Sequence, residues 1–269
     1  MNSQDYSTEL NKQIDDVLKF HPLIYDHRAD YPWLTGYLGN PYAGMWFIAE
    51  IPSLLRVERA SQRKNQVISE DTQWSESPGD KLFREMLFKH GFKLDNPFLP
   101  GGWNCYITNV IKQTSYVKDW EDKTQTAQRR TADIWSSVLS WELTNSKPLM
   151  VVVMGSKTKK LLEYLAANKK IHLPITEFIT HYSYIGSRPQ GKLGPMHPDR
   201  IRDYDFEFAR IRNKFDALYN KNESLKLQRD IPSPSVRNLQ DNINLDPAEA
   251  DRIAIEAQQA VRHQEPDFQ

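Results

Sequence analysis

Short apolar runs that alternate with amphipathic segments restrict the fold of this chain more than any other feature. The runs have the length of buried strands. They cover residues 44–49, 106–111, 149–154 and 175–181. Other segments have apolar residues at helical spacing. They cover residues 4–20, 80–91, 121–143, 155–167 and 204–219. Alternating strands and helices predict a three-layer α/β/α fold with a short, mostly parallel four-stranded central sheet.

The composition changes along the chain and indicates how it is organised. We expect residues 1–220 to form the α/β domain, in which the polar and charged residues 55–78 are an inserted loop or lid. Residues 221–269 are rich in Asn, Gln, Asp, Glu and Arg, and they contain too few apolar residues to build a core. Within this tail, residues 247–263 could form one isolated helix. We interpret the tail as a flexible or partner-binding appendage.

Charge and cysteine content exclude several classes of site. Lys plus Arg and Asp plus Glu number 35 each, so DNA binding would need a local basic patch. Cys105 is the only cysteine in the sequence, which excludes an intrachain disulfide, a cysteine-based zinc site and a four-cysteine iron–sulfur cluster. We therefore expect no metal and no cofactor. The polar N-terminus and the short apolar runs predict a cytoplasmic protein without a membrane partner.

Polar side chains follow the predicted strands at Glu50, Asn109 and His181. In a parallel α/β sheet, ligands bind outside the carboxyl ends of the strands. Glu50 is then either a group of the active site, acting on water or on a cationic sugar, or an acid that holds the turn by accepting backbone N–H groups. The amide of Asn109 could read the edge of a base, but Asn is also common in turns.

His181 is either a histidine satisfied within the core or the first residue of a binding loop. The loop HYSYIGSRPQGK contains two glycines, hydroxyl groups and the cations Arg188 and Lys192. Such a loop could bind a phosphate backbone, although a solvated surface loop would look similar. The run Gly155-Ser156-Lys157 lacks the spacing of a phosphate-binding P-loop, and this excludes a P-loop nucleotide triphosphatase.

Five segments in this order resemble the uracil-DNA glycosylase superfamily, especially its compact bacterial and archaeal branch. Glu50 and Pro52 of WFIAEIPS match its Gly-Glu-Ala-Pro-Gly motif, and SPGDKLFREMLFKHGF resembles the helix that follows. The strand YITNVIK and the segment VVVMGSKTKKLLEYL match the next two motifs. His181 and Ser183 match the closing His-Pro-Ser motif, with Tyr182 in place of proline. The resemblance covers residues 42–215.

The resemblance implies a role for each of these positions. Glu50 and the turn to Ser53 would line the site where water attacks the anomeric carbon. Asn109 would bind the flipped base, and His181 would stabilise the charge on the leaving base. Trp46, Phe47 or Tyr42 would stack on the base. The expected DNA contacts are Ser183, Tyr184, Ile185, Arg188 and Lys192, with Tyr184 or Ile185 as the wedge and Arg188 near phosphate.

The chain also departs from that family. The iron–sulfur cysteines are absent, and Ile51 occupies the place of the water-activating aspartate. Either Glu50 would substitute for it, or the insertion would supply a catalytic acid from among Glu58, Glu70 and Asp71. We expect a monofunctional DNA glycosylase that removes uracil or a modified pyrimidine, in repair or in defence against foreign DNA. Two alternatives remain open. One is a non-catalytic DNA- or base-binding member that recruits or inhibits a partner, and the other is a hydrolase of free nucleosides or nucleotides.

Overall fold

The computed structural model describes residues 3–28, 37–53, 77–99, 101–187 and 193–221. The chain divides into two compact units, Met1–Asp230 and Ile231–Gln269. The second unit lies wholly outside the described residues, as does the helix predicted at 247–263. The insertion predicted at 55–78 also lies outside them, apart from its last two residues.

A mixed five-stranded sheet, in the order β1-β3-β2-β4-β5, forms the centre of the described residues. Its strands are β1 (Leu38–Gly39), β2 (Met45–Ala49), β3 (Tyr106–Asn109), β4 (Met150–Met154) and β5 (Ile175–Ile179). The neighbours among β2 to β5 pair in parallel, whereas β1 pairs antiparallel with β3. The predicted α/β class is therefore confirmed, but the predicted number of four strands was wrong. The additional strand has two residues, too few to give a pattern in the sequence.

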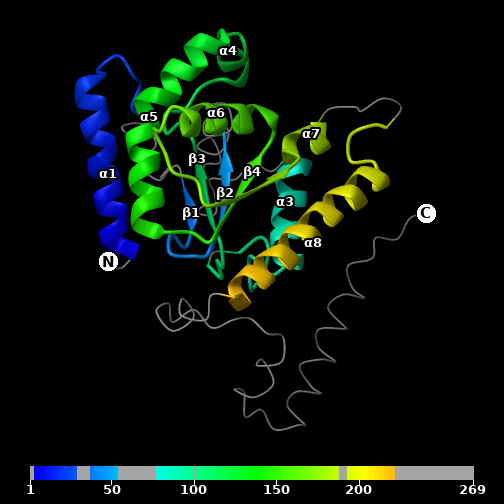
Figure 1. The fold of residues 1–269 in the computed structure, drawn as a ribbon. Coiled ribbons are helices and arrows are strands. Elements are labelled where there is room, and N and C mark those ends of the chain that lie inside the picture. The colour runs from blue at the N-terminus through cyan, green and yellow to red at the C-terminus, as the bar shows by residue number, and fades with distance from the viewer. Residues whose placement is uncertain (1–2, 29–36, 54–76, 100, 188–192, 222–269) are drawn as a thin grey trace. The chain divides into compact units, whose positions relative to one another are not determined.

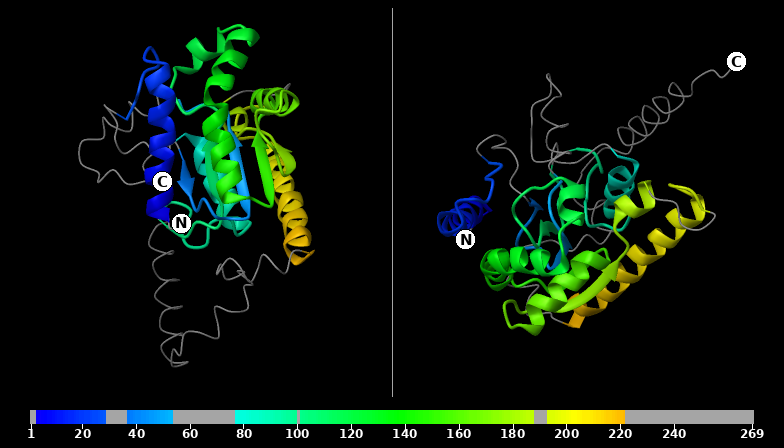
Figure 2. Two further views of the ribbon diagram at one scale, coloured as in Figure 1. Left: turned by 60° about the vertical axis from the view of Figure 1, so that its left-hand side comes forward. Right: turned by 90° about the horizontal axis from the view of Figure 1, so that it is seen from above.

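Helices cover both faces of the sheet (Figures 1 and 2). The first face packs against α1 (Ser3–Phe20), α5 (Gln125–Ser146) and α6 (Ser156–Ala167). The second face packs against α3 (Pro78–Lys89), α7 (Tyr182–Ser187) and α8 (Pro198–Lys221). A short helix, α4 (Val117–Glu121), follows β3. No described helix is long and apolar enough to cross a membrane.

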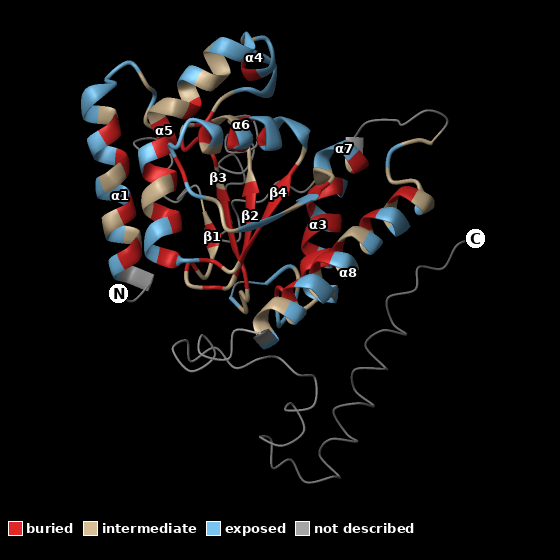
Figure 3. Cartoon of the chain, in the orientation of Figure 1, coloured by how far each residue is buried: buried red, intermediate tan, exposed pale blue. Residues whose placement is uncertain are grey.

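Burial on both faces of the sheet explains why the inner strands β2 and β4 contain only apolar residues. All five residues of β4 are buried, and Figure 3 shows the central strands as buried while the outer faces of the helices are exposed. In β2, Trp46 and Ile48 belong to the core cluster on the first face, and Met45 and Phe47 belong to the cluster on the second. The alternation follows from the two-residue period of a strand.

Local signals set the beginning of α3, the helix that leads from the insertion into the domain. Ser77 is the N-cap residue, and its hydroxyl oxygen accepts a hydrogen bond of 3.3 Å from the Asp80 backbone N–H. Pro78 occupies the first helical position, where its fixed φ suits the helix and no N–H is needed. The predicted start at Asp80 was two residues late.

Helix α8 is fastened to β5 by charged side chains. Arg210 and Lys214 both form ion pairs with Glu177 of β5. The Arg210 guanidinium also donates a hydrogen bond of 3.0 Å to the carbonyl oxygen of Phe178. These contacts join the last strand in the sheet order to the helix α8. They lower the pKa of the Glu177 carboxyl, against the opposing effect of its partial burial.

Candidate active site at the carboxyl edge of the sheet

Four parallel strands bring the predicted polar residues to one edge of the sheet. Asn109 is the last residue of β3 and lies in register with Ala49 of β2, so Glu50 follows directly beside it. His181 comes two residues after the end of β5. Neighbouring strands lie ~4.8 Å apart, so the edge from β3 to β5 spans ~14 Å.

The chain reverses its direction of travel across the sheet between β2 and β4. From β2 it continues through α3 to β3 on one side, and from β4 it continues through α6 to β5 on the other. Ligands of open α/β sheets bind at such a switch point, outside the carboxyl ends of the strands. Glu50 and Gly155 are the residues that follow these two strands.

The backbone holds the chain directly after β2, since the N–H of Ile111 donates to the Glu50 carbonyl at 3.1 Å. In the described part of the chain, Oε1 of Glu50 is buried without a hydrogen bond. Burial raises the pKa of this carboxyl, and the nearby Trp120 indole and Lys157 ammonium oppose the rise. Among the described residues, no backbone N–H donates to Oε1 of Glu50, as a turn-stabilising acid would require of its carboxylate.

His181 is held as a neutral imidazole with a defined tautomer. Its Nδ1 accepts the backbone N–H of Ser183 at 3.2 Å and lies 2.8 Å from the Ser183 hydroxyl. Because Nδ1 accepts, the ring proton resides on Nε2. Although the residue keeps some surface exposure, protein surrounds most of the ring, and this desolvation lowers the pKa of His181 to about 4. At neutral pH the Nε2–H is therefore an uncharged donor.

Aromatic rings and a glycine fix the orientation of this imidazole. The Tyr182 ring stacks on His181 with centroids 4.3 Å apart, and Phe83 of α3 stacks on Tyr182 at 5.1 Å. On the side of β4, Gly155 has a φ of 89°, and a Cβ there would lie 3.0 Å from the His181 Cβ. Glycine is needed at position 155 for both reasons.

Replacing Gly155 with alanine is expected to destabilise the protein by about 1–3 kcal/mol, because the left-handed φ becomes strained. The new methyl group also presses on His181, so any activity that depends on this imidazole should fall as well. Urea unfolding measures the stability. Gly194→Ala is a matched control, because a Cβ at Gly194 would meet no atom of the described residues within 4 Å. Equal stability of the two variants would contradict the prediction.

Asn109 is half-buried, and a buried polar network lies behind its strand. Lys112 forms an ion pair with Glu142 of α5, and Nζ of Lys112 donates to the Thr108 hydroxyl at 2.6 Å. Oε1 of Glu142 accepts hydrogen bonds from the hydroxyls of Tyr106, at 2.9 Å, and Thr108, at 3.1 Å. Burial lowers the pKa of Lys112, and the Glu142 carboxylate opposes this shift. The network ties β3 to α5 directly before Asn109.

Two predicted base-stacking residues and one predicted wedge are part of the core. Trp46 and Phe47 are each 0% exposed, Trp46 in the first-face cluster and Phe47 in the second. The Trp46 indole N–H donates to the Pro41 carbonyl at 3.2 Å. Ile185 is 3% exposed and packs in the second-face cluster. The structure thus contradicts a base-stacking role for Trp46 and Phe47 and a wedge role for Ile185, because none of them reaches the surface.

Two of the other predicted DNA contacts lie on α7, and the remaining two lie outside the described residues. Residues 182–187 form a helix where a loop was expected. Ser183 is exposed, and Tyr184 is 39% exposed. Arg200 holds this region by donating to the carbonyls of Tyr184, at 2.7 Å, and Gly194, at 3.0 Å. Arg188 and Lys192 lie outside the described residues.

Trp120 and Lys157 belong to the same edge. Sequence reasoning noted Lys157, in the run Gly155-Ser156-Lys157 that follows a predicted strand, but did not find Trp120. Both act on the Glu50 carboxyl, and Lys157 of α6 pairs with Glu121 of α4 at 2.7 Å. Trp120 lies on α4, and this helix has five residues, too few for a periodic pattern that could have predicted it.

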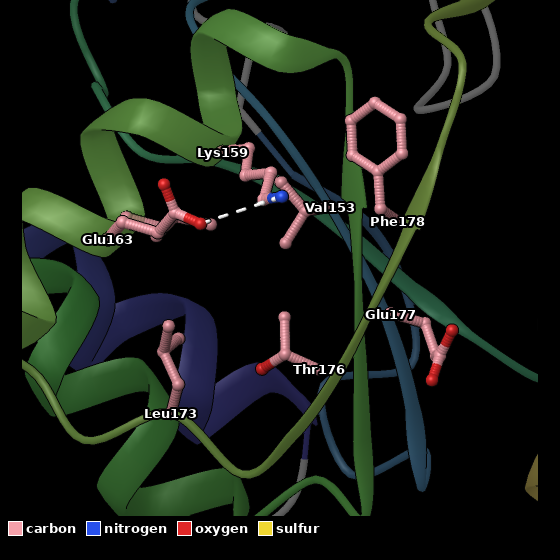
Figure 4. A pocket seen from close by; sticks show the side chains of 8 residues that line it. Val153, Lys159, Glu163, Leu173, Thr176, Glu177 and Phe178 are labelled. Carbon is pink, nitrogen blue, oxygen red and sulfur yellow. Dashed lines mark ion pairs between the residues drawn. The ribbon is translucent and has the colours of Figure 1, made fainter.

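A separate shallow groove of about 240 Å³ lies between α6 and β5 (Figure 4). Its lining includes the exposed Phe178 and the Lys159–Glu163 ion pair, whose N–O distance is 3.6 Å. None of the three polar residues of the carboxyl edge lines it. We assign this groove no part in the candidate site.

No candidate metal site among the described residues and no similar protein extends this description of the site. In the ranges that the structure describes, no group of three or more His, Cys, Asp or Glu residues could hold a metal ion. No protein-family model matches the chain, and a search of curated proteins found no significant similarity.

Proposed function

We propose that this protein is a DNA glycosylase that hydrolyses the N-glycosidic bond of a base flipped out of DNA. The observation that carries the proposal is the His181 imidazole, whose Nδ1 is occupied by Ser183 and whose Nε2–H is a neutral donor. A neutral donor of this kind stabilises negative charge that develops on a leaving group. Asn109 and Glu50, on two neighbouring strand ends, supply the other groups that the reaction needs.

In the proposed reaction, the side-chain amide of Asn109 hydrogen-bonds the edge of the flipped base. The bond between C1′ of the sugar and the base nitrogen breaks, and the base leaves with the electron pair. The Nε2–H of His181 donates to the base oxygen on which negative charge accumulates. Water adds to the cationic C1′, and its proton passes to the Glu50 carboxylate. No covalent enzyme intermediate is required.

The surroundings of this edge suit an anionic polymer. Helix α6 begins at the switch point, and helix N-termini favour anions. Lys157, Lys159 and Lys160 in its first turns are exposed. Tyr184 on α7 is the remaining candidate for a side chain that enters the base stack, because it is exposed and Arg200 holds its carbonyl.

Base release from a panel of oligonucleotides tests this function, with uracil, hypoxanthine and modified cytosines read as abasic-site cleavage. We expect release of one base class, and we expect Glu50→Gln to slow that release by about 10²- to 10⁴-fold, since the amide cannot accept the water proton. The control is Glu163→Gln, which changes a carboxylate on the groove instead.

Two outcomes would contradict the proposal. DNA binding with no release of any base would favour the non-catalytic base-binding alternative. Release that is unchanged in Glu50→Gln would show that the water-activating group lies elsewhere.

A further inference from the structure

We propose that Glu207 of α8 is the positioning residue that sets the orientation of His181. This inference rests on the proposed function, because it assigns His181 a task that requires a fixed ring. Glu207 does not belong to the carboxyl edge itself. Its effect is transmitted through Thr180, the residue directly before His181.

The contact between Glu207 and Thr180 is bidentate. The backbone N–H of Thr180 donates to Oε2 of Glu207 at 2.8 Å, and the Thr180 hydroxyl donates to Oε1 at 2.8 Å. Both donors belong to one residue, so the carboxylate restrains the Thr180 backbone and χ1 together. Hydrogen bonds to an ionised carboxylate are stronger than neutral ones. The chain is therefore anchored one residue before the imidazole.

Packing alone does not account for a carboxylate at this position. Glu207 comes three residues after Tyr204 and four before Ile211, both of which are buried in the second-face core. An apolar side chain would extend that core at no cost in desolvation. Attachment of β5 to α8 is already supplied by Arg210 and Lys214 through Glu177. What Glu207 adds is control of the segment that leads from β5 into His181.

With Glu207 included, His181 is restrained from three directions. Thr180 is anchored before it, the Ser183 N–H binds Nδ1 after it, and Gly155, the residue after β4, lies close against its Cβ. Loss of the first restraint would let residues 180–181 move away from β4. The ring would then gain solvent, and its pKa would rise from about 4 toward the ordinary histidine value of 6.5.

Two measurements on the full chain test this role. In Glu207→Ala, we expect kcat for base release to fall about 10- to 100-fold while KM changes little, because misplacement of a catalytic group affects the chemical step. In NMR titrations, the His181 ring should titrate at higher pH than in the unaltered protein. Glu207→Gln should restore most of both properties, because its amide oxygen can still accept the Thr180 N–H.

Arg210→Gln is the matched control, since it removes a charged contact between the same helix and strand two residues further from His181. It should leave both kcat and the His181 titration unchanged. An unchanged His181 titration in a folded Glu207→Ala variant would overturn the proposal. The titration needs no catalysis, so it decides the role of Glu207 even if the protein releases no base, a result that would refute the proposed function separately.

Discussion

Replacing His181 with glutamine is expected to slow base release by about 10²- to 10³-fold, the loss typical of removing one preorganised donor to a developing negative charge. The stability should change little, because the amide can still accept the Ser183 N–H. Single-turnover release, compared with binding of the same oligonucleotide, separates the chemical step from affinity. A matched His172→Gln variant replaces an exposed histidine before β5, away from the carboxyl edge, and should keep the rate of bond cleavage.

The pH dependence of release follows from two pKa shifts. The pKa of His181 is lowered to about 4, so the imidazole stays in its neutral donor form as the pH falls and is protonated only near pH 4. Burial raises the pKa of Glu50 above 4.5, so this carboxylate is protonated first. The rate should therefore fall on the acid side because Glu50 loses its charge. In Glu50→Gln, a residual rate that falls on the acid side with a midpoint near 6.5 would contradict a desolvated His181.

The second large effect concerns stability. Lys112→Ala or Glu142→Ala is expected to lower the free energy of unfolding by about 3–5 kcal/mol, because each leaves a buried charge without its partner. Urea unfolding monitored by tryptophan fluorescence measures this loss. Lys159→Ala is the control, since it removes an exposed ion pair on α6 and should cost about 0.5 kcal/mol or less.

The network also predicts what a double replacement does. Lys112→Met combined with Glu142→Leu removes both charges, but the hydroxyls of Tyr106 and Thr108 lose the carboxylate that accepts their hydrogen bonds. The double variant should therefore be more stable than the Ala variant of either residue but less stable than the unaltered protein. Losses below about 1 kcal/mol in both single variants would show that the pair is not a closed buried network.

Periodicity predicted most of the elements, and its failures have physical reasons. The strands β2 to β5 and the helices α1, α3, α5, α6 and α8 were predicted because apolar residues recur at the periods of strands and helices. The elements β1, α4 and α7 have two, five and six residues, so no period can be recognised in them. These short elements are held by tertiary contacts, which a local pattern does not contain.

The candidate site was predicted in part, because strand ends are visible in sequence but accessibility is not. Glu50, Asn109 and His181 lie at one edge as expected. Trp46 and Phe47 were misjudged because helices cover both faces of the sheet, so neither side of β2 is open to a ligand. Whether a strand residue faces a helix or a cleft depends on packing between distant segments.

Glu142 and Glu207 were missed although the sequence contains a signal for both. Glu142 follows Leu139 by three residues and Val138 by four, within the buried stripe of α5. Glu207 occupies a comparable place between Tyr204 and Ile211 of α8. A charged residue within an apolar helical stripe needs a partner inside the protein, so the amino-acid pattern of such a helix is enough to indicate a buried network.

The Arg210 side chain has a further consequence for how copies of this protein meet. The outermost strand of a sheet offers backbone groups to which a strand of another molecule can add. On β5, the carbonyl of Phe178 already accepts from Arg210, and Glu177 beside it is engaged by two cations. A second molecule would have to displace these charged contacts before its backbone could pair. The contacts of Arg210 and Lys214 with β5 therefore also oppose self-association and aggregation through this strand.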